Sequence, residues 1–242
     1  MTTYKIALAG NPNTGKSTLF NALTGLKQHT GNWAGKTVEI AKGSFKFLND
    51  NYEIIDLPGT YSLYATSSDE EVARDFILFK KPDVTIVVLD ATALERNLNI
   101  LLQILEITNK VIVCINLIDE AERKGISIND KALADELKVP VIKVSARNKQ
   151  GFDHLLNTIH KFVHGKIVTK FYSINYSPEL EMKISQIEPM IKKIVGNHLP
   201  SRWLAVQLLD GNKDLVERLT SHLSHKLKEG QNDHEAKFTF TF

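Results

Sequence analysis

The 242-residue sequence predicts an α/β fold, a doubly wound and mostly parallel sheet, followed by a small all-helical domain. Three runs of almost continuous Val and Ile recur at regular intervals, over residues 84–90, 110–116 and 141–145. Such runs are typical of parallel strands that are covered on both faces. Helical patterns separate these runs, and beyond Gly165 only helical periodicity continues. We therefore expect two domains, residues 1–166 and residues 167–242.

The amino-terminal part of the first domain predicts a strand, a helix and a hairpin. An apolar run ends at Gly10, and apolar residues then recur every three or four positions, as on one face of a helix. Further along, apolar and polar residues alternate on either side of a turn-forming Asn49-Asp50-Asn51 sequence, which favours two paired strands. The expected segments are a strand over 5–9, a helix from Gly15 to Gly25, a loop over 27–37, and strands over 38–47 and 52–56.

The rest of the first domain alternates helices with the buried strands. Ser68 is a suitable N-cap for a helix over 69–80, because its hydroxyl can accept a bond from a first-turn N–H group. Further helical patterns cover residues 97–108, 128–137 and 151–163. Right-handed crossovers bring the carboxyl ends of parallel strands to one edge of the sheet, where α/β proteins bind ligands. The loops that follow the strands are therefore the expected place for a site.

The second domain is predicted to begin with a linker over 166–177 and to continue as helices. Apolar residues spaced by three and four favour a helix after Ser177, and Pro189 inside that helix should kink or split it. Residues 202–209 and 214–228 are further helical candidates, whereas residues 237–242 alternate like a strand without an evident partner. The apolar stripe of the first helix consists of Leu180, Ile184, Ile187, Ile191 and Ile194.

Composition favours a soluble, cytoplasmic protein. The 30 basic and 28 acidic residues leave a net charge of +2, which gives no global electrostatic footprint for nucleic acid or membrane. No apolar stretch approaches the roughly 18 residues that a membrane-spanning helix requires, and the amino terminus offers no signal peptide. The single cysteine, Cys114, cannot form an internal disulfide and lies within an apolar run. We expect it to be a buried structural thiol.

Residues 10–17 read GNPNTGKS and fit the phosphate-binding pattern G-x-x-x-x-G-K-[ST], between a strand and a helix. Glycines let the loop direct backbone N–H groups at a phosphate, and the helix amino terminus adds a favourable dipole. Lys16 can reach the β- and γ-phosphate oxygens, and the Ser17 hydroxyl can coordinate Mg²⁺. We assign phosphate binding to Gly10, Asn11, Pro12, Asn13, Thr14, Gly15, Lys16, Ser17 and Thr18.

Three later motifs favour GTP over ATP, and each follows a predicted strand. Asp56 can hold a Mg²⁺-bound water, and the N–H of Gly59 can sense the γ-phosphate. Asp119 can accept bonds from N1–H and N2–H of guanine, a pair of donors that adenine lacks. A backbone N–H of the third motif can bond the guanine O6. The motif residues are Asp56, Leu57, Pro58 and Gly59; Asn116, Leu117 and Asp119; and Ser145, Ala146 and Arg147.

These motifs resemble the G1, G3, G4 and G5 boxes of translation-factor-related GTPases, which implies a Ras-like P-loop GTPase fold for the first domain. The fourth box is usually Asn-Lys-x-Asp, and here Leu117 replaces the Lys. In that family the Lys stem packs along the phosphate loop. The replacement therefore implies weaker nucleotide affinity and faster exchange.

The segment G-N-W-A-G-K-T-V-E at residues 31–39 resembles the first switch of the ferrous iron transport protein B family. Residues 56–63, 70–75 and 202–209 resemble the second switch, the helix after it and a part of the family's helical domain. The resemblance runs from about residue 4 to about residue 210. It implies a GTP-binding switch domain that hydrolyses GTP slowly and regulates ferrous iron uptake. It also implies the cytosolic part of a protein whose permease domain carries Fe²⁺ through the bacterial inner membrane; an oligomer stays open.

The same resemblance implies further ligands. Thr37 matches the switch threonine that binds Mg²⁺ when GTP is present, and Gly35 and Lys36 precede it beside the nucleotide. Asn13 matches an asparagine that helps to hold K⁺ against the phosphates, and carbonyls of Gly31 and Trp33 could complete the K⁺ shell. The residues expected to act in hydrolysis are Lys16, Thr37 and Gly59; those expected around the metals are Ser17, Thr37 and Asp56 for Mg²⁺ and Asn13, Gly31 and Trp33 for K⁺.

Slow turnover is expected because two common catalytic groups are missing from the sequence. Thr60 stands where many GTPases place a Gln that orients the attacking water, and it is too short for the same reach. The first switch contains no Arg, and we expect Arg74 and Arg96 to lie on helix surfaces. Charge must then be neutralised by Lys16, Mg²⁺ and K⁺.

Three alternatives remain at this point. A ribosome- or RNA-associated GTPase shares these boxes, but the region after residue 167 shows no G-x-x-G loop or basic-aromatic strand, so no nucleic acid is expected. Asn116 and Asp119 argue against a P-loop kinase or ATPase. Direct iron binding would use His160 with His164, or His222 with His225. Since no carboxylate or cysteine joins either pair, we expect ordinary solvated histidines.

Overall fold

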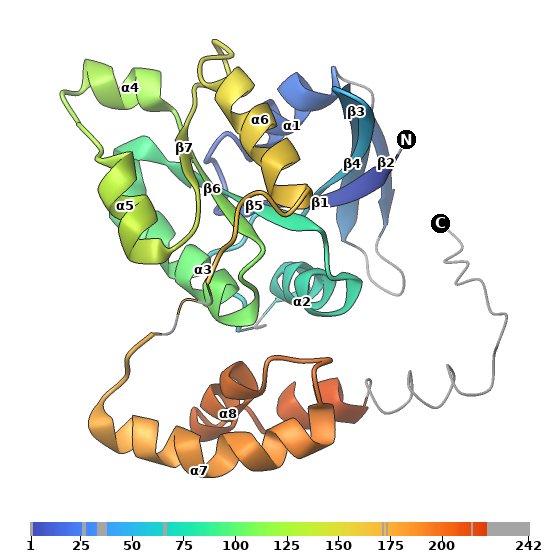
Figure 1. The fold of residues 1–242 in the computed structure, drawn as a ribbon, viewed down its shortest axis with the longest axis vertical. Coiled ribbons are helices and arrows are strands. Elements are labelled where there is room, and N and C mark those ends of the chain that lie inside the picture. The colour runs from blue at the N-terminus through green and yellow to red at the C-terminus, as the bar shows by residue number, and fades with distance from the viewer. Residues whose placement is uncertain are drawn as a thin grey trace, which may run out of the picture. The chain divides into compact units, whose positions relative to one another are not determined.

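The computed structural model describes residues 2–25, 28–32, 38–64, 67–170, 172, 174–213 and 215–221. The chain divides into two compact units, which part after Tyr172. The first unit contains a seven-stranded sheet flanked by helices, and the second contains helices (Figure 1). This architecture confirms the predicted fold class, whereas the boundary at residues 166 and 167 stays a prediction.

The sheet has the strand order β2-β3-β4-β1-β5-β6-β7. Strand β1 pairs in parallel with β4 and β5, and β5, β6 and β7 continue the parallel part. Strands β2, β3 and β4 form an antiparallel meander at the other side. The strands are β1 (Thr3–Gly10), β2 (Gln28–Asn32), β3 (Glu39–Phe47), β4 (Asp50–Asp56), β5 (Val84–Asp90), β6 (Val111–Asn116) and β7 (Val141–Lys143).

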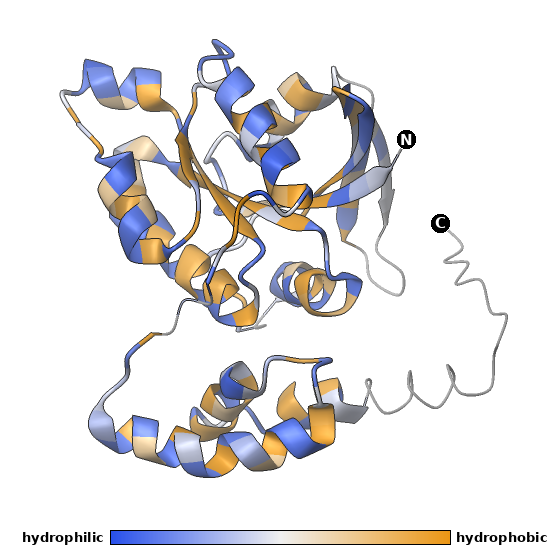
Figure 2. Ribbon diagram, viewed as in Figure 1, coloured by the Kyte–Doolittle hydropathy of each residue, from blue (hydrophilic) through white to orange (hydrophobic). Residues whose placement is uncertain are grey.

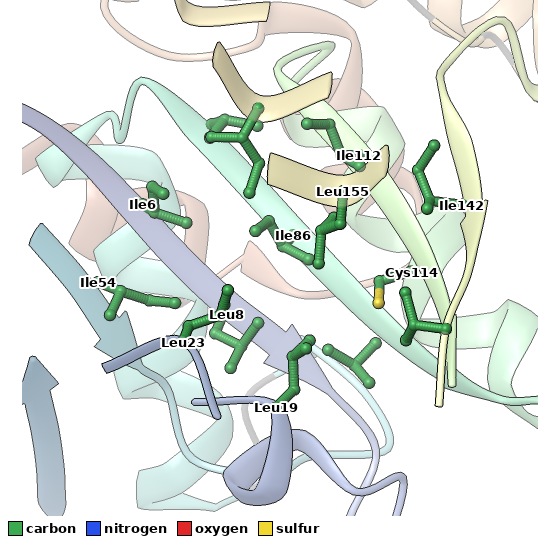
Figure 3. Close-up of a cluster of buried hydrophobic side chains, with 14 of the residues drawn as sticks. Ile6, Leu8, Leu19, Leu23, Ile54, Ile86, Ile112, Cys114, Ile142 and Leu155 are labelled. Carbon is green, nitrogen blue, oxygen red and sulfur yellow. The ribbon is translucent and has the colours of Figure 1, made fainter. Parts of the chain in front are cut away.

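Helices cover both faces of the sheet, which is why strands β5 and β6 are apolar along most of their length (Figure 2). Helices α1 and α6 pack on one face, where they enclose a buried cluster with side chains of β1, β4, β5 and β6 (Figure 3). Helix α3 contacts β1 and β5 and lies on the opposite face (Figure 1). The helices of this unit are α1 (Lys16–Thr24), α2 (Ser68–Asp75), α3 (Leu94–Ile107), α4 (Ile118–Arg123), α5 (Asp130–Leu137) and α6 (Phe152–Val163).

Several expectations for the first unit are wrong in detail. Part of the expected loop over 27–37 is strand β2, which pairs with β3 through its backbone and so needs no apolar alternation. The helix expected over 69–80 begins one residue earlier, with Ser67 as its N-cap. It ends as α2 at Asp75 and continues as a π-helix, Phe76–Lys80. A short 3₁₀ turn, Ala91–Ala93, precedes α3. The short helix α4 was not expected.

Arg74 is also placed differently from the expectation. Its side chain is 1% exposed, and its Nε and Nη2 donate to Asp75 Oδ1 at 2.9 and 2.6 Å. The neighbouring carboxylate compensates the charge, which makes burial of a guanidinium tolerable. Arg96 is exposed on α3 as expected, and its guanidinium carbon lies 4.9 Å from the centre of the Tyr61 ring.

The second unit is built on helices α7 (Pro178–Val195) and α8 (Ser201–Leu209). Helix α7 runs through Pro189 without a break, so the expected split is wrong. Buried residues on both sides of the proline, Ile184 and Ile191, keep the helix in place. The expected apolar stripe shifts at its end, because Val195 is buried and Ile194 is exposed.

An ion pair holds the start of α8 to α7. The guanidinium of Arg202 donates to Glu181 Oε2 and Oε1 at 3.0 and 2.7 Å and to the Ile174 carbonyl at 3.0 Å. Residues 222–242, with His222, His225 and the alternating carboxyl-terminal run, lie outside the described residues. Within the described part of the chain, no helix is both long and apolar enough to cross a membrane.

Candidate functional site

The phosphate-binding loop joins β1 to α1 at the carboxyl edge of the sheet. Gly10 has φ 149°, and a Cβ there would lie 2.4 Å from the Val88 carbonyl oxygen. Gly15 has φ 76°, and a Cβ there would lie 2.3 Å from Asn116 Nδ2. Both positions therefore require glycine, for conformation and for space. The loop therefore packs against β5 at Val88 and against the end of β6 at Asn116, although both strands come much later in the sequence.

A cation, a hydroxyl and a carboxylate converge beside this loop. Lys16 is only 8% exposed, its Nζ contacts Asp56 Oδ1, and it donates to the Leu57 carbonyl at 2.6 Å. The Ser17 hydroxyl donates to Asp56 Oδ2 at 3.3 Å. Helix α1 and strand β4 thus bring together groups that are about 40 residues apart in the sequence. A hydroxyl and a carboxylate are hard oxygen donors of the type that Mg²⁺ prefers.

The segment after β4 lies directly on the phosphate loop. A Cβ on Gly59 would approach the Cα of Pro12 to 3.2 Å. The N–H of Thr60 donates to the Gly10 carbonyl at 3.2 Å, and its side chain is buried. Gly59 is therefore held where its N–H can face a ligand in the loop.

The same segment is then fastened to α3, which sequence reasoning missed. The N–H of Leu63 donates to Gln103 Oε1 at 2.7 Å, and Asn99 Nδ2 donates to the Tyr61 carbonyl at 3.2 Å. Arg96 covers the Tyr61 ring from the preceding turn of α3. The available signal was the spacing of three and four between these polar residues, which places them on one face of the helix.

Asn116 connects the phosphate loop with the third motif. Its side chain is completely buried at the end of β6. Its Nδ2 donates to the Thr14 carbonyl at 2.9 Å, and its Oδ1 accepts from the Ala146 N–H at 2.9 Å. The asparagine amide is one of few groups that can donate and accept in this way. Three sequence motifs are thereby fixed relative to one another.

Leu117 takes a left-handed conformation, with φ 63°, and directly precedes α4. Its Cδ2 lies 3.7 Å from the position that a Cβ of Gly15 would take. The leucine therefore packs on the phosphate loop, where the Lys stem packs in related GTPases. Leu117 thus provides apolar packing at the position where a Lys stem would otherwise provide it. The expected loss of nucleotide affinity stays a prediction.

Asp119 offers a buried acceptor that is not satisfied. Its Oδ1 has no hydrogen-bond partner among the described residues, whereas Asn148 Nδ2 donates to its Oδ2 at 3.3 Å. Leaving such an atom unpaired costs about 1–3 kcal/mol, which suggests that a ligand supplies the donor. The carboxylate lines an open pocket of about 710 Å³, shared with Glu122, Arg123, Arg147 and Asn148. Asn148 was not predicted from the sequence.

The remaining expected site residues are divided between described and undescribed parts of the chain. Asn13 and Thr18 are exposed on the phosphate loop and at the start of α1, and Gly31 is exposed in the edge strand β2. Pro58 and Ser145 lie in the loops that carry the second and third motifs. Trp33, Gly35, Lys36 and Thr37 lie outside the described residues.

A mostly parallel sheet with a phosphate loop after β1 and polar motifs after β4, β6 and β7 defines a P-loop GTPase fold. Comparison with known proteins agrees. Residues 4–159 match the family Ferrous iron transport protein B, and residues 176–241 match the FeoB cytosolic helical domain. The chain belongs to the ferrous iron transport protein B family.

Individual relatives give the extent of the similarity. The Fe(2+) transporter FeoB of Staphylococcus aureus is 36% identical over 221 residues, which cover 91% of this chain and 33% of that protein. The Fe(2+) transporter FeoB of Methanocaldococcus jannaschii is 41% identical over 217 residues, 90% of this chain and 32% of that protein. The chain thus spans about a third of the length of these relatives.

Solved structures show the same relationship. The cytosolic domain of the T. maritima FeoB iron transporter, in a GDP form, has a TM-score of 0.83 and 36% identity. The alignment covers 91% of this chain and 85% of that one. The cytosolic domain of L. pneumophila FeoB has a TM-score of 0.79 and 35% identity, over 90% of this chain and 88% of that one.

Proposed function

We propose that this chain binds GTP and GDP, hydrolyses GTP slowly, and acts as a switch domain that regulates ferrous iron uptake. The observation that carries the proposal is the Asp119 carboxylate, which lines an open pocket and whose Oδ1 has no partner among the described residues. It lies in the same motif as Asn116, whose side chain bonds the phosphate loop. Relatives support it, because the T. maritima cytosolic domain was solved in GDP and GMPPNP forms. Family membership favours this function over an RNA-associated GTPase.

The guanine base would be selected by the motifs that follow β6 and β7. The two oxygens of Asp119 would accept N1–H and N2–H of guanine, a pair of donors that adenine cannot offer. Because the Ala146 N–H already donates to Asn116, the loop of residues 145–147 is held in one conformation and can present a backbone N–H to the guanine O6. Leu117 would pack on the same side as the phosphate loop.

The phosphates would be bound by the loop from Gly10 to Thr18 and by Lys16. Mg²⁺ would be held by Ser17 and Thr37 directly and by Asp56 through a water, and it would neutralise charge on the β- and γ-phosphates. The Ser17 hydroxyl and the Asp56 carboxylate, 3.3 Å apart, suit this ion. With phosphate present, the Lys16 ammonium has a second anionic partner besides Asp56. Gly59 would bond the γ-phosphate.

Slow hydrolysis is supported by the placement of the two arginines nearest the second switch in the described part of the chain, neither of which is free to act as an arginine finger. Arg74 is buried against Asp75, and Arg96 lies on the Tyr61 ring. Thr60 is buried, with its N–H bound to the phosphate loop, and is too short to orient water as a Gln would. Lys16, Thr37 and Gly59 are the residues we assign to hydrolysis.

K⁺ is the proposed additional cation, held by Asn13 with carbonyls of Gly31 and Trp33. Asn13 is exposed on the loop, at φ 65°. Its side chain makes no hydrogen bond to another described residue of its loop, which leaves the amide oxygen available to a cation. A monovalent cation there would neutralise charge that develops between the phosphates.

The whole-protein role follows from the relatives, which are named Fe(2+) transporters and are about three times longer than this chain. We propose that the chain is the cytosolic part of such a transporter, on the cytoplasmic face of the bacterial inner membrane. Its partner would be the permease domain of the same polypeptide.

The decisive experiment exchanges the base preference. Asp119→Asn should weaken binding of fluorescent GDP and improve binding of the xanthine analogue, because the exocyclic oxygen of xanthine requires a donor. Glu122→Gln is the matched control, since Glu122 lines the same pocket but is exposed and has no base to bind. Equal affinity of the native chain for ATP and GTP would contradict the proposal.

A further inference from the structure

Two histidines and an aspartate meet at a place that is separate from the nucleotide site. His160 on α6 and His164, the C-cap residue of that helix, have ring centres 4.3 Å apart. His164 Nε2 lies 2.7 Å from Asp50 Oδ2, and His160 Nδ1 lies 3.5 Å from the same oxygen. The expectation that no carboxylate joins this histidine pair is wrong. Asp50 is the first residue of β4, more than 100 residues earlier, so sequence spacing gave no sign of it.

The distances suit a metal ion as well as a hydrogen bond. Zn²⁺ and similar ions bind nitrogen and oxygen at about 2.0–2.2 Å, so the donor atoms around them lie about 3–3.5 Å apart. One potential ligand atom from each of the three residues lies within 4.8 Å of the other two, and the two distances to Asp50 Oδ2 are in this range or slightly below. Small side-chain movements would therefore complete the coordination.

The cluster is held by rigid elements and aromatic neighbours. Asp50 is 8% exposed at the first position of β4, where it pairs with Phe47 of β3. The rings of Phe47 and Tyr4 meet His160 and His164 edge-on, at 6.1 and 5.5 Å. Apolar neighbours of this kind limit solvent access to a metal site and lower its local dielectric constant.

The surroundings also leave a path for an ion. The side chain of Asp50 is 10% exposed, whereas those of His160 and His164 are 20% and 34% exposed. Exposure thus increases from the nearly buried carboxylate to the partly exposed imidazole of His164, which an ion can reach from solvent. The Tyr52 hydroxyl lies 3.1 Å from His160 Nδ1, so a metal ion at that nitrogen would replace this hydrogen bond.

We propose that Asp50, His160 and His164 bind a divalent first-row transition-metal ion, such as Zn²⁺, Co²⁺ or Fe²⁺. Two imidazoles with one carboxylate suit these ions, whereas Mg²⁺ and Ca²⁺ prefer oxygen ligands alone. Three protein ligands leave positions for water. The site is distinct from the expected Mg²⁺ position, because Asp50 begins β4 and Asp56 ends it, about 20 Å away at 3.3 Å per residue. The proposal does not depend on nucleotide binding.

The test is a titration of the full chain with Co²⁺, followed by its visible d–d absorption, in excess Mg²⁺ that occupies hard oxygen sites. One equivalent should bind, and Asp50→Asn and His164→Ala should each weaken binding at least about tenfold. His154→Ala is the matched control, since His154 is exposed on the same helix. A His222→Ala/His225→Ala double variant should bind as the wild type does.

Circular dichroism and thermal unfolding establish that each variant is folded. If Asp50→Asn and His164→Ala fold and still bind Co²⁺ like the wild type, the proposal is wrong, and the cluster is an ordinary ion pair. If a variant does not fold, NMR of the wild type with Zn²⁺ still tests the proposal. Zn²⁺ should shift the imidazole NMR signals of His160 and His164 together at one equivalent, and shifts confined to other histidines would overturn the assignment.

Discussion

Asn116→Ala tests whether the buried amide at the end of β6 organises the nucleotide site. The substitution removes two hydrogen bonds of 2.9 Å and leaves the Thr14 carbonyl and the Ala146 N–H without their partner. Each buried group left unpaired costs about 1–3 kcal/mol, so the folded site loses about 2–6 kcal/mol of stabilisation. Because both groups belong to loops that we assign to nucleotide binding, much of this loss should appear as weaker binding.

This loss of free energy can be converted into an expected change of GDP affinity. A free energy of about 1.4 kcal/mol corresponds to a tenfold change, so full expression of the loss would weaken GDP binding by about thirtyfold to about ten-thousandfold. We expect at least a tenfold increase in the dissociation constant, since part of the loss will appear in the stability of the nucleotide-free chain. Equilibrium titration of fluorescent GDP, together with urea unfolding, measures both parts.

Asn97 provides the matched control. It is 3% exposed, its Nδ2 donates to the Ala93 carbonyl at 2.8 Å, and its Oδ1 accepts from the Asp90 N–H at 3.3 Å. Asn97→Ala therefore removes the same pair of bonds from a place outside the phosphate loop. It should lower the unfolding free energy comparably while leaving GDP affinity within about twofold. Equal losses of GDP affinity in the two variants would refute this role of Asn116.

Three further outcomes are expected. If K⁺ acts at Asn13, GTP turnover in K⁺ should exceed that in Na⁺ at matched ionic strength, and Asn13→Ala should abolish the difference while GDP still binds; equal rates in both salts for the wild type would exclude K⁺. Complete burial raises the pKa of the Cys114 thiol, so iodoacetamide should leave the folded chain unlabelled and react only in denaturant; rapid labelling of the folded chain would contradict this. The hydrogen bond from Arg202 lowers the pKa of Glu181, so the ion pair stabilises the second unit above the unfolded glutamate pKa and its contribution disappears as the pH falls through the lower folded value. The melting temperature of Glu181→Gln should therefore lie below that of the wild type at neutral pH and approach it in acid, whereas a pH-independent difference would argue against the ion pair.

The elements that the sequence predicts well are those whose pattern reports burial. Strands β5 and β6 are covered on both faces, so their Val and Ile runs indicate them directly. Strand β2 has no such pattern, because an edge strand is held by backbone pairing on one side. The π-helix after Asp75 likewise has no distinct periodicity over its five residues. Continuity of α7 through Pro189 depends on tertiary packing that a local rule does not contain.

The site divides in a similar way. Motif spacing predicts Lys16, Asp56, Asn116 and Asp119, because nucleotide chemistry demands those residue types after particular strands. Partners that only position other residues carry no such demand, and so Gln103, Asn99 and Asn148 were missed. The Asp50 cluster was missed for a related reason. Its members come from opposite ends of the domain, and only the register of β4 beneath α6 brings them together.

The second switch connects the motif residues at the phosphates with the residues of α3 that position it. Thr60 is bonded to the phosphate loop through Gly10, and Leu63, three residues later, is bonded to Gln103 of α3. A chain of three residues spans at most about 11 Å, so it can absorb only a small displacement. Any movement of Gly59 toward a γ-phosphate must therefore be taken up between Thr60 and Leu63, or it must break the Gln103 bond, or it must move α3. Asn99, which donates to the Tyr61 carbonyl, and the buried Gln103 are thus the points at which a change at the phosphates would reach helix α3.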